Sequence, residues 1–485
     1  MKKALCPFLA VLFLLSACLF LSCEGEKKNR TSYDISCEYF EDGTLSGSET
    51  VDYYNDTDLS VNELKFNLYG NAFRKDAVFS PVADGFVSRA YYSGESYGGI
   101  EIIACKVNGV DAEFSVCGAD MNVLSVLLLQ ELFPQERAQI FIEYKLTLAK
   151  VVARTGINRK TINLANFYPV LCARDEKGFY ECVYYPTGDP FFSDCADYKV
   201  TLTTDKKFVA CLSGKRIQSK EEGDKRTVVY GIENARSFCA VLSENFESVS
   251  KSQNGVEINY FFYDDSDHEK TLSVACEAVK FFSDKFGAYP YPTFNVVQTE
   301  FIQGGMEYPS LVMISDGLEK EAYSEVVVHE TAHQWWQSVV GTNENEYAFI
   351  DEGLAEYSVV LFYENFPEYG MNRSDMIASA EKTYGAFCTV FDKLFGGADT
   401  RMSRNLGDFS GEYEYVNIAY IKSCLMFETL RQTIGDAKFF NGLKSFYSNN
   451  SFRNVTPSEL IGAFEKVGAN SNGFFESFID GKVVL

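Results

Sequence analysis

The stretch Glu325-Val-Val-Val-His-Glu-Thr-Ala-His-Gln-Trp-Trp-Gln337 decides how the fold and the chemistry of this chain are predicted. Within it, His329-Glu330-Thr331-Ala332-His333 has the pattern H-E-x-x-H. On a helix the two histidines lie one turn apart on the same face, so their imidazoles can share one tetrahedral Zn²⁺. Glu330 lies beside them, where its carboxylate can accept a proton from the attacking water. The stretch therefore predicts a helix that carries two zinc ligands and a general base.

A catalytic zinc site needs a third protein ligand and one open position. Glu352 is the candidate, because it follows His333 by 19 residues and begins a second predicted helix after the short loop 341–347. From there its carboxylate can face the first helix. The alternative is an ordinary solvated acid at a helix start, which the helix dipole also favours. Only three histidines occur in the chain, so a chance match to H-E-x-x-H is rare.

The residues around these ligands resemble the M1 family of zinc metallopeptidases, the aminopeptidase family. H-E-x-x-H followed by eighteen residues and Glu is the family's pattern, and Glu352-Gly-Leu-Ala-Glu-Tyr357 is typical of it. Upstream, Gly304-Gly-Met-Glu-Tyr308 is similar to the family's G-x-M-E-N exopeptidase motif. Downstream, Tyr420-Ile-Lys-Ser423 is similar to the stretch that carries its catalytic tyrosine. The elements occur in the family's order, and the resemblance extends from about Tyr33 to the C-terminus.

This resemblance implies a zinc-dependent aminopeptidase with one Zn²⁺ bound by His329, His333 and Glu352. Glu330 is then the general base, which takes a proton from water and passes it to the leaving amine. Tyr420 is expected to donate a hydrogen bond to the oxyanion. It is chosen because its stretch resembles the family's segment, since spacing alone cannot select one of 30 tyrosines. Ser423 stands where the family usually has Gly.

The resemblance also implies that Glu307 makes the protein an exopeptidase. Its carboxylate would pair with the α-ammonium of the substrate and so restrict cleavage to the first residue. Gly304 and Gly305 allow close backbone approach, so this segment can pair with a peptide as an extra strand. Tyr308 replaces the family's usual Asn. The expected substrates are peptides with a free N-terminus, and an ordinary loop glutamate is the alternative for Glu307.

Two neighbouring features have a supporting part in this interpretation. Glu356 lies one turn after Glu352, where it either hydrogen bonds a metal ligand or is an ordinary exposed glutamate. Trp335 and Trp336 are expected to pack the zinc helix.

Residues 33–250 are predicted to form an all-β domain. Alternating or β-branched runs such as 140–148 and 198–204 are separated by turn residues, which is typical of two packed sheets. This part is similar to the saddle-like N-terminal domain of the M1 family. Within it, Tyr185–Pro190 is interpreted as a surface loop, and no residue is predicted to be catalytic. His268, in the polar link that follows, is expected to be exposed.

Residues 251–485 are predicted to be mainly helical. Thr271–Phe286 has a helical apolar stripe, and further helices are expected around 418–435, 436–448 and 457–467. The resemblance identifies this part as the family's thermolysin-like catalytic domain. The expected fold class is therefore multidomain α+β, an all-β saddle-like domain followed by a mainly α catalytic domain, as in a short bacterial two-domain member.

The N-terminus has the layout of a secretory leader. Lys2 and Lys3 precede the apolar run 4–22, and a polar segment follows, which predicts a leader at 1–23 and a tether at 24–32. Cys18 and Cys23 are both candidates for a lipidated cysteine of a bacterial lipoprotein. An uncleaved membrane anchor is the alternative, since 19 apolar residues are just long enough to span. Either way, the body is expected outside the cytoplasm, tethered to a membrane.

Charge and cysteine content restrict the function further. Lys and Arg number 44 against 68 Asp and Glu, and the net charge of −24 argues against nucleic acid as a partner. Fourteen cysteines include eleven beyond the leader, and no C-x-x-C pair supports a cysteine zinc site. Buried free thiols are expected for most of them, with a few disulfides left open.

Two other functions remain open at this point. One is a zinc hydrolase of different specificity, an endopeptidase or an enzyme acting on a non-peptide. The other is a non-catalytic binding module that keeps its metal. An intact Glu330 and Tyr420 argue against the binding module.

Overall fold

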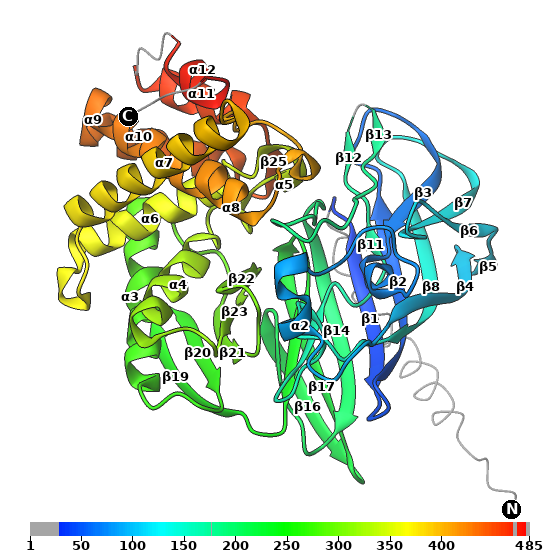
Figure 1. The fold of residues 1–485 in the computed structure, drawn as a ribbon. Helices are drawn as coiled ribbons and strands as arrows, with labels where there is room; N and C mark the ends of the chain where they lie inside the picture. The colour runs from blue at the N-terminus through cyan, green and yellow to red at the C-terminus, as the bar shows by residue number, and fades with distance from the viewer. Residues whose placement is uncertain (1–28, 176, 469–472, 482–485) are drawn as a thin grey trace, which may run out of the picture.

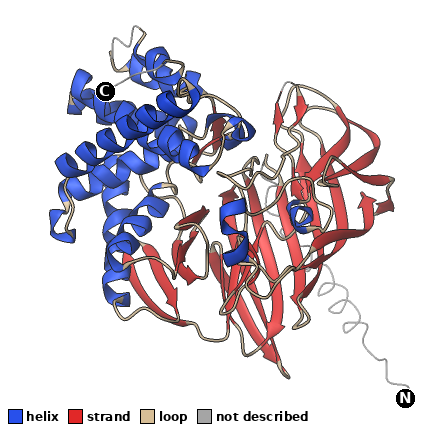
Figure 2. Cartoon of the chain, viewed as in Figure 1, coloured by secondary structure: helices blue, strands red, loops and turns tan. Residues whose placement is uncertain are grey.

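The computed structural model describes residues 29–175, 177–468 and 473–481 (Figure 1). The predicted leader at 1–23 and its candidate cysteines Cys18 and Cys23 lie outside the described residues, as does most of the tether. Figure 2 shows the long strands gathered on one side of the molecule and the helices on the other. In the described part of the chain, no helix combines the length and the apolar character that crossing a membrane requires.

An eight-stranded sheet is the largest element of the N-terminal part, with the order β16-β17-β14-β1-β2-β8-β4-β5. Neighbouring strands are antiparallel except β1 and β14, which are parallel. In β2 and β8 every second residue is buried, because successive side chains of a strand point to opposite faces. The strands are β1 (Ser32–Tyr39), β2 (Thr44–Tyr54), β4 (Gly99–Val107), β5 (Val110–Asp111), β8 (Arg137–Thr147), β14 (Ala196–Asp205), β16 (Lys215–Glu222) and β17 (Lys225–Ala235).

Two four-stranded sheets and a small hairpin complete this part, so the prediction of only two packed sheets is wrong. The reason lies in short strands such as β10 and β18, which are buried on both faces and so show no alternation to read. One sheet comprises β15 (Val209–Leu212), β18 (Cys239–Ser243), β10 (Ile162–Ala165) and β9 (Thr155–Ile157). The other comprises β11 (Val170–Leu171), β3 (Val61–Asn67), β7 (Val123–Leu132) and β6 (Phe114–Cys117). The hairpin is β12 (Arg174–Asp175) with β13 (Gly178–Phe179), and the helix α2 spans Val87–Ala90.

A five-stranded sheet of order β19-β20-β21-β23-β22 begins the C-terminal part. The predicted domain boundary between residues 250 and 251 falls inside β19, which pairs with β20. Strand β22 lies at the open edge and pairs only with β23 in this sheet. The strands are β19 (Glu247–Gln253), β20 (Val256–Phe262), β21 (Thr293–Thr299), β22 (Gly305–Tyr308) and β23 (Leu311–Ser315).

Helices pack against this sheet and form most of the rest of the C-terminal part (Figure 1). They are α3 (His268–Lys285), α4 (Lys320–Ala332), α5 (Glu344–Tyr347), α6 (Asp351–Asn365), α7 (Arg373–Phe395), α8 (Glu412–Tyr415), a π-helix (Val416–Lys422), α9 (Ser423–Ile434), α10 (Asp436–Asn450), α11 (Pro457–Lys466) and α12 (Phe474–Ile479). The two-stranded pair β24 (Val340–Thr342) and β25 (Arg453–Val455) joins distant segments.

His268 differs from the sequence expectation, and the cysteines agree with theirs. His268 begins α3 and is half-buried, with its ring stacked on Phe262 at 4.6 Å between centroids, so the expectation of an exposed histidine is wrong.

Of the eleven cysteines beyond the leader nine are buried, and none is disulfide-bonded within the described residues.

Arg236 joins the β-rich part to the helical part. This buried guanidinium donates from Nε to the carbonyl of Gln337 at 2.7 Å, and from Nη1 to that of Ser193 at 3.2 Å. Its Nη2 donates to the carbonyl of Arg453 at 2.6 Å. One side chain therefore satisfies carbonyls from the β-rich part, from the residues after α4 and from β25.

We expect Arg236→Ala to lower the free energy of unfolding by about 3 kcal/mol or more, because buried carbonyls lose their charged donor. Urea denaturation followed by tryptophan fluorescence measures the change. Arg216→Ala is the matched control, since Arg216 is exposed on β16 and should change stability by about 0.5 kcal/mol or less. Equal losses in the two variants would contradict this account of Arg236.

Candidate active site

Helices α4 and α6 bring the predicted metal ligands together. His329 lies in the last turn of α4, and His333 directly follows the helix with helical backbone angles. Glu352 lies at the start of α6, as predicted. Val328 and Ala332 are fully buried on α4, which fixes the helix against the core and aims both imidazoles toward α6.

The three donor atoms converge as the corners of a tetrahedral zinc site do. Nε2 of His329 and Nε2 of His333 are 3.1 Å apart, and they lie 3.4 and 3.2 Å from Oε2 of Glu352. Zn²⁺ ligands at about 2.0–2.1 Å lie about 3.3–3.4 Å from one another in a tetrahedron. Oε2 of Glu352 is buried and makes no hydrogen bond within the described residues. The residues present therefore fit zinc.

The outer nitrogens of both histidines are held by neighbouring groups. Nδ1 of His333 lies 3.0 Å from the carbonyl of Trp336, and Nδ1 of His329 lies 3.3 Å from Oε2 of Glu356. Of the two alternatives for Glu356, the structure shows the ligand contact. Such partners orient an imidazole and raise its basicity as a ligand. Burial opposes ionisation of Glu352, but the imidazoles of His329 and His333 beside its carboxylate outweigh burial and lower its pKa to about 2.

Tyr420 and Tyr415 both reach the third ligand. The Tyr420 hydroxyl donates to Oε1 of Glu352 at 2.5 Å, and that of Tyr415 approaches the same oxygen at 3.5 Å. Tyr415 is the last residue of α8, and Tyr420 lies five residues later in the π-helix, which the sequence pattern did not predict. Ser423 packs directly on α6, because a Cβ added at Gly353 would lie 2.3 Å from the Ser423 Cβ.

Glu330 lies in a position suited to proton transfer. It is 5% exposed, and its Oε2 makes no hydrogen bond within the described part of the chain. Burial raises its pKa to about 7, which suits a group that accepts and returns a proton near neutral pH. Gly305 leaves the room for it, since a Cβ there would lie 2.3 Å from Oε1 of Glu330.

Strand β22 presents Glu307 beside the metal ligands. Gln334, which follows His333, holds the turn after this strand: its Oε1 accepts from the Ser310 amide at 2.8 Å, and its Nε2 donates to the Tyr308 carbonyl at 3.1 Å. Because β22 is the edge of its sheet, an extended peptide can pair with it as a further strand. The Gln334 hydrogen bonds thus connect the strand that carries Gly305 and Glu307 to the end of α4.

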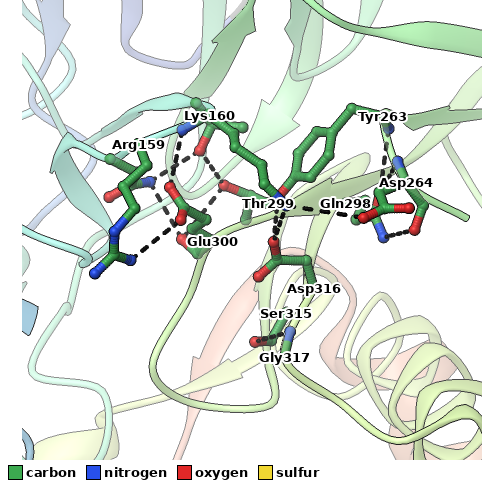
Figure 3. A network of polar contacts seen from close by, with 12 residues as sticks. Arg159, Lys160, Tyr263, Asp264, Gln298, Thr299, Glu300, Ser315, Asp316 and Gly317 are labelled. Carbon is green, nitrogen blue, oxygen red and sulfur yellow. Dashed lines mark hydrogen bonds and ion pairs between the residues drawn. The ribbon is translucent and has the colours of Figure 1, made fainter. Parts of the chain in front are cut away.

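A polar network from the β-rich part holds the loop before this strand (Figure 3). The Glu300 carboxylate accepts from the Lys160 amide at 2.9 Å and from Nη1 of Arg159 at 3.3 Å. The Thr299 hydroxyl donates to the side-chain carbonyl of Asn163 at 2.8 Å. The position of Glu307 therefore depends on both parts of the chain.

Sequence reasoning missed an acidic cluster behind Glu307. The loop Tyr185–Pro190, predicted at the surface, lines the cleft instead, and its Asp189 is buried with Glu307 and Glu344. Carboxylate oxygens of the three residues lie within 4.8 Å of one another. Arg154 forms an ion pair with Asp189. The sequence Gly188-Asp-Pro190 predicts a turn of the backbone, but it does not indicate which other segments pack around that turn. The place of Asp189 in the cleft could therefore not be predicted from it.

Burial governs the titration of this cluster. It raises the pKa of Asp189 and of Glu344 well above their ordinary values, and that of Glu307 to about 7. The residues line or adjoin a cleft of about 360 Å³ that also contains the metal ligands, Glu330 and Tyr420. That volume is in the range of pockets that bind small ligands.

Comparison with known proteins agrees with this geometry. Residues 270–478 match the family model described as the Peptidase family M1 domain. Aminopeptidase N of Lactococcus lactis subsp. lactis is 23% identical over 257 residues, which are 48% of this chain and 29% of that protein. Aminopeptidase M1-A of Oryza sativa subsp. japonica is 22% identical over 400 residues, 76% of this chain and 43% of that protein. The chain thus spans less than half the length of these curated relatives.

Solved structures show the same two-part fold. The M1 zinc metallopeptidase from Deinococcus radiodurans superposes with a TM-score of 0.67 at 17% identity, covering 94% of this chain and 95% of that chain. A mutant of the Deinococcus radiodurans protein bound to a Tyr-Ser-Ala substrate gives 0.66 at 18% identity, with the same coverage. The predicted fold class and the resemblance stated from the sequence are confirmed.

We expect Glu356→Gln to weaken zinc binding by roughly 10–100-fold, because His329 loses the carboxylate that orients it. Competition with a chromophoric zinc chelator measures the affinity. Glu325→Gln removes the same charge one turn before His329, where no hydrogen bond to the histidine exists in the described structure, and it should change the affinity little. Similar losses in both variants would show that charge, and not the contact, supports the site.

Proposed function

We propose, from the peptidase family M1 domain that the chain carries at residues 270–478, that this protein is a zinc-dependent aminopeptidase acting on peptides. The observation that carries the proposal is the convergence of His329, His333 and Glu352 beside Glu330 and Glu307. When bound by the three ligands, zinc supplies the Lewis acidity that makes water a nucleophile at neutral pH. The remaining steps belong to side chains of the cleft.

Glu330 transfers the proton. Its carboxylate accepts a proton from the attacking water and then returns it to the nitrogen of the leaving amine, so one group is base and then acid. Its pKa of about 7 in the buried site suits both directions. Gly305 keeps the backbone close without displacing this carboxylate.

Tyr420 stabilises the oxyanion. Burial raises the pKa of its phenol, so the hydroxyl keeps its proton and can donate a hydrogen bond. Its position beside Glu352 brings the donor to the edge of the metal site, where negative charge develops on the carbonyl oxygen. Donors already in place cost no reorganisation during the reaction.

Glu307 sets the exopeptidase specificity. Its buried carboxylate binds the α-ammonium of a peptide that lies along β22, and this places the first peptide bond at the metal site. The free N-terminus is therefore the feature by which the cleft recognises its substrate. An endopeptidase would need the peptide to continue past Glu307.

The location of the protein is proposed from the sequence. The leader pattern at 1–23, followed by a polar tether, supports an exported lipoprotein held on the extracytoplasmic side of a membrane. Cys18 and Cys23 remain the two candidates for the lipidated residue. Mass spectrometry of the membrane fraction after expression of the full chain would test this, and an unmodified protein in the soluble fraction would argue against it.

We expect Glu330→Gln to lower kcat by roughly 10²–10⁴-fold on aminoacyl reporter substrates, because the isosteric amide cannot accept the proton. Zinc content should stay at the wild-type value, and metal analysis checks it. Glu321→Gln, exposed in the first turn of the same helix, is the control and should keep full activity. Undiminished turnover in the Glu330 variant would refute the mechanism.

We expect Glu307→Gln to raise KM for free peptides by roughly 10–100-fold, because a charged hydrogen-bond pair with the α-ammonium is lost. The measurement compares kcat/KM for free and N-acetylated forms of one peptide. The wild type should prefer the free form strongly, and the variant should lose most of that preference. Equal cleavage of both forms by the wild type would favour a zinc hydrolase of another specificity.

A further inference from the structure

Glu325 and Glu356, which we call the acidic wall, line the cleft beside His329. We propose that Glu325 makes the enzyme selective for peptides with a basic residue, lysine or arginine, directly after the bond that is cut. The inference rests on the proposed aminopeptidase function and extends it from the first residue of the substrate to the second.

The direction of a bound peptide follows from the way helix α4 lies along strand β22. A Cβ added at Gly304 would lie 3.4 Å from a methyl group of Val326, and one added at Gly305 would lie 2.3 Å from Oε1 of Glu330. The helix and the strand therefore run in the same direction, and Glu307 follows Gly305 on the strand. A peptide whose α-ammonium is bound at Glu307 must cross the metal site and continue toward Gly304 and Val326.

This direction brings the second residue of the substrate to the acidic wall. Glu325 adjoins Val326 on α4 and lies one turn before His329. Glu356 lies one turn after Glu352 on α6, with its Oε2 3.3 Å from Nδ1 of His329. Both glutamates are half-buried, so their carboxylates stay accessible from the cleft. A basic side chain after the cut bond therefore meets two carboxylates.

The acidic wall has no cation of its own. Within the described residues Glu325 makes no hydrogen bond and no ion pair, and the ion-pair partner of Glu356 is His329, which is neutral as a zinc ligand. Of the residues that line the cleft in the described structure, Arg154 is the one lysine or arginine, and it is paired with Asp189. The positive charge that complements the wall must come from the substrate.

The two carboxylates of the wall also act on each other. Burial and, after it, the charge of Glu356 raise the pKa of Glu325. An ammonium or guanidinium group beside both carboxylates offsets this repulsion. Because both side chains are half-exposed, water and salt screen the attraction, and a preference of roughly three- to tenfold is expected.

The test compares the tripeptides Ala-Lys-Ala, Ala-Gln-Ala and Ala-Glu-Ala, which differ only in the second residue. We expect kcat/KM of the wild type to decrease in that order, with lysine preferred over glutamine roughly three- to tenfold. Glu325→Gln should lose most of this preference, whereas Glu325→Asp, which keeps the charge, should retain part of it. Glu321→Gln, exposed one turn earlier on α4, is the matched control and should keep the order.

Two further measurements separate charge recognition from a structural effect. Metal analysis should find wild-type zinc content in each variant. Raising NaCl from about 0.05 to about 0.5 M should reduce the preference of the wild type for lysine, because salt screens accessible charges. This second measurement needs no variant, so it decides the question even if a substitution prevents folding.

Equal kcat/KM for the three peptides in the wild type would overturn the inference, as would a lysine preference that Glu325→Gln retains in full. Aminoacyl reporter substrates have no second residue, so their turnover tests the proposed function separately. If the wild type cleaves no free peptide, the proposed function fails. Calorimetry with the three uncleaved tripeptides then decides the inference: tighter binding of Ala-Lys-Ala is expected, and equal binding would contradict it.

Discussion

The structure depends on one constraint: two imidazoles and a carboxylate from separate helices must point at the same spot, with their donor atoms little more than 3 Å apart. Buried donors that face one another are costly without a cation, so the surrounding packing must hold them there. α4 is fixed by its apolar face, α6 by its close approach to Ser423, and each imidazole by a partner on its outer nitrogen. The cleft is built around this arrangement.

His329, His333 and Glu330 were predictable from sequence because their spacing follows from helix geometry. His329 and His333 are four residues apart on one helix, and that period needs no knowledge of the rest of the fold. Glu352 was a candidate from its place at the start of a second predicted helix, a choice that the resemblance supported, whereas Glu307 and Tyr420 were found through the resemblance alone. The structure brings all three to the same cleft. Their roles are proposals that kinetics can test.

The features that were missed arise from long-range packing. Asp189 and Glu344 are 155 residues apart, and no periodicity connects a loop of the β-rich part with a short helix after β24. The π-helix was also missed, because its apolar pattern differs little from that of an α-helix over seven residues. Strands buried on both faces, such as β10 and β18, lack the alternation by which sheets are counted.

Strand β22 is held in place by contacts from both parts of the chain. The zinc ligands and Glu330 all lie in the helical part, but the loop before β22 is anchored by Lys160 and Asn163, and Asp189 also comes from the β-rich part. Separated from the β-rich part, the C-terminal part would keep the predicted metal ligands, Glu330 and Glu307, but it would lose Asp189 and the contacts that hold the loop before β22. The β-rich part thus helps to fix the position of Glu307 relative to the metal ligands.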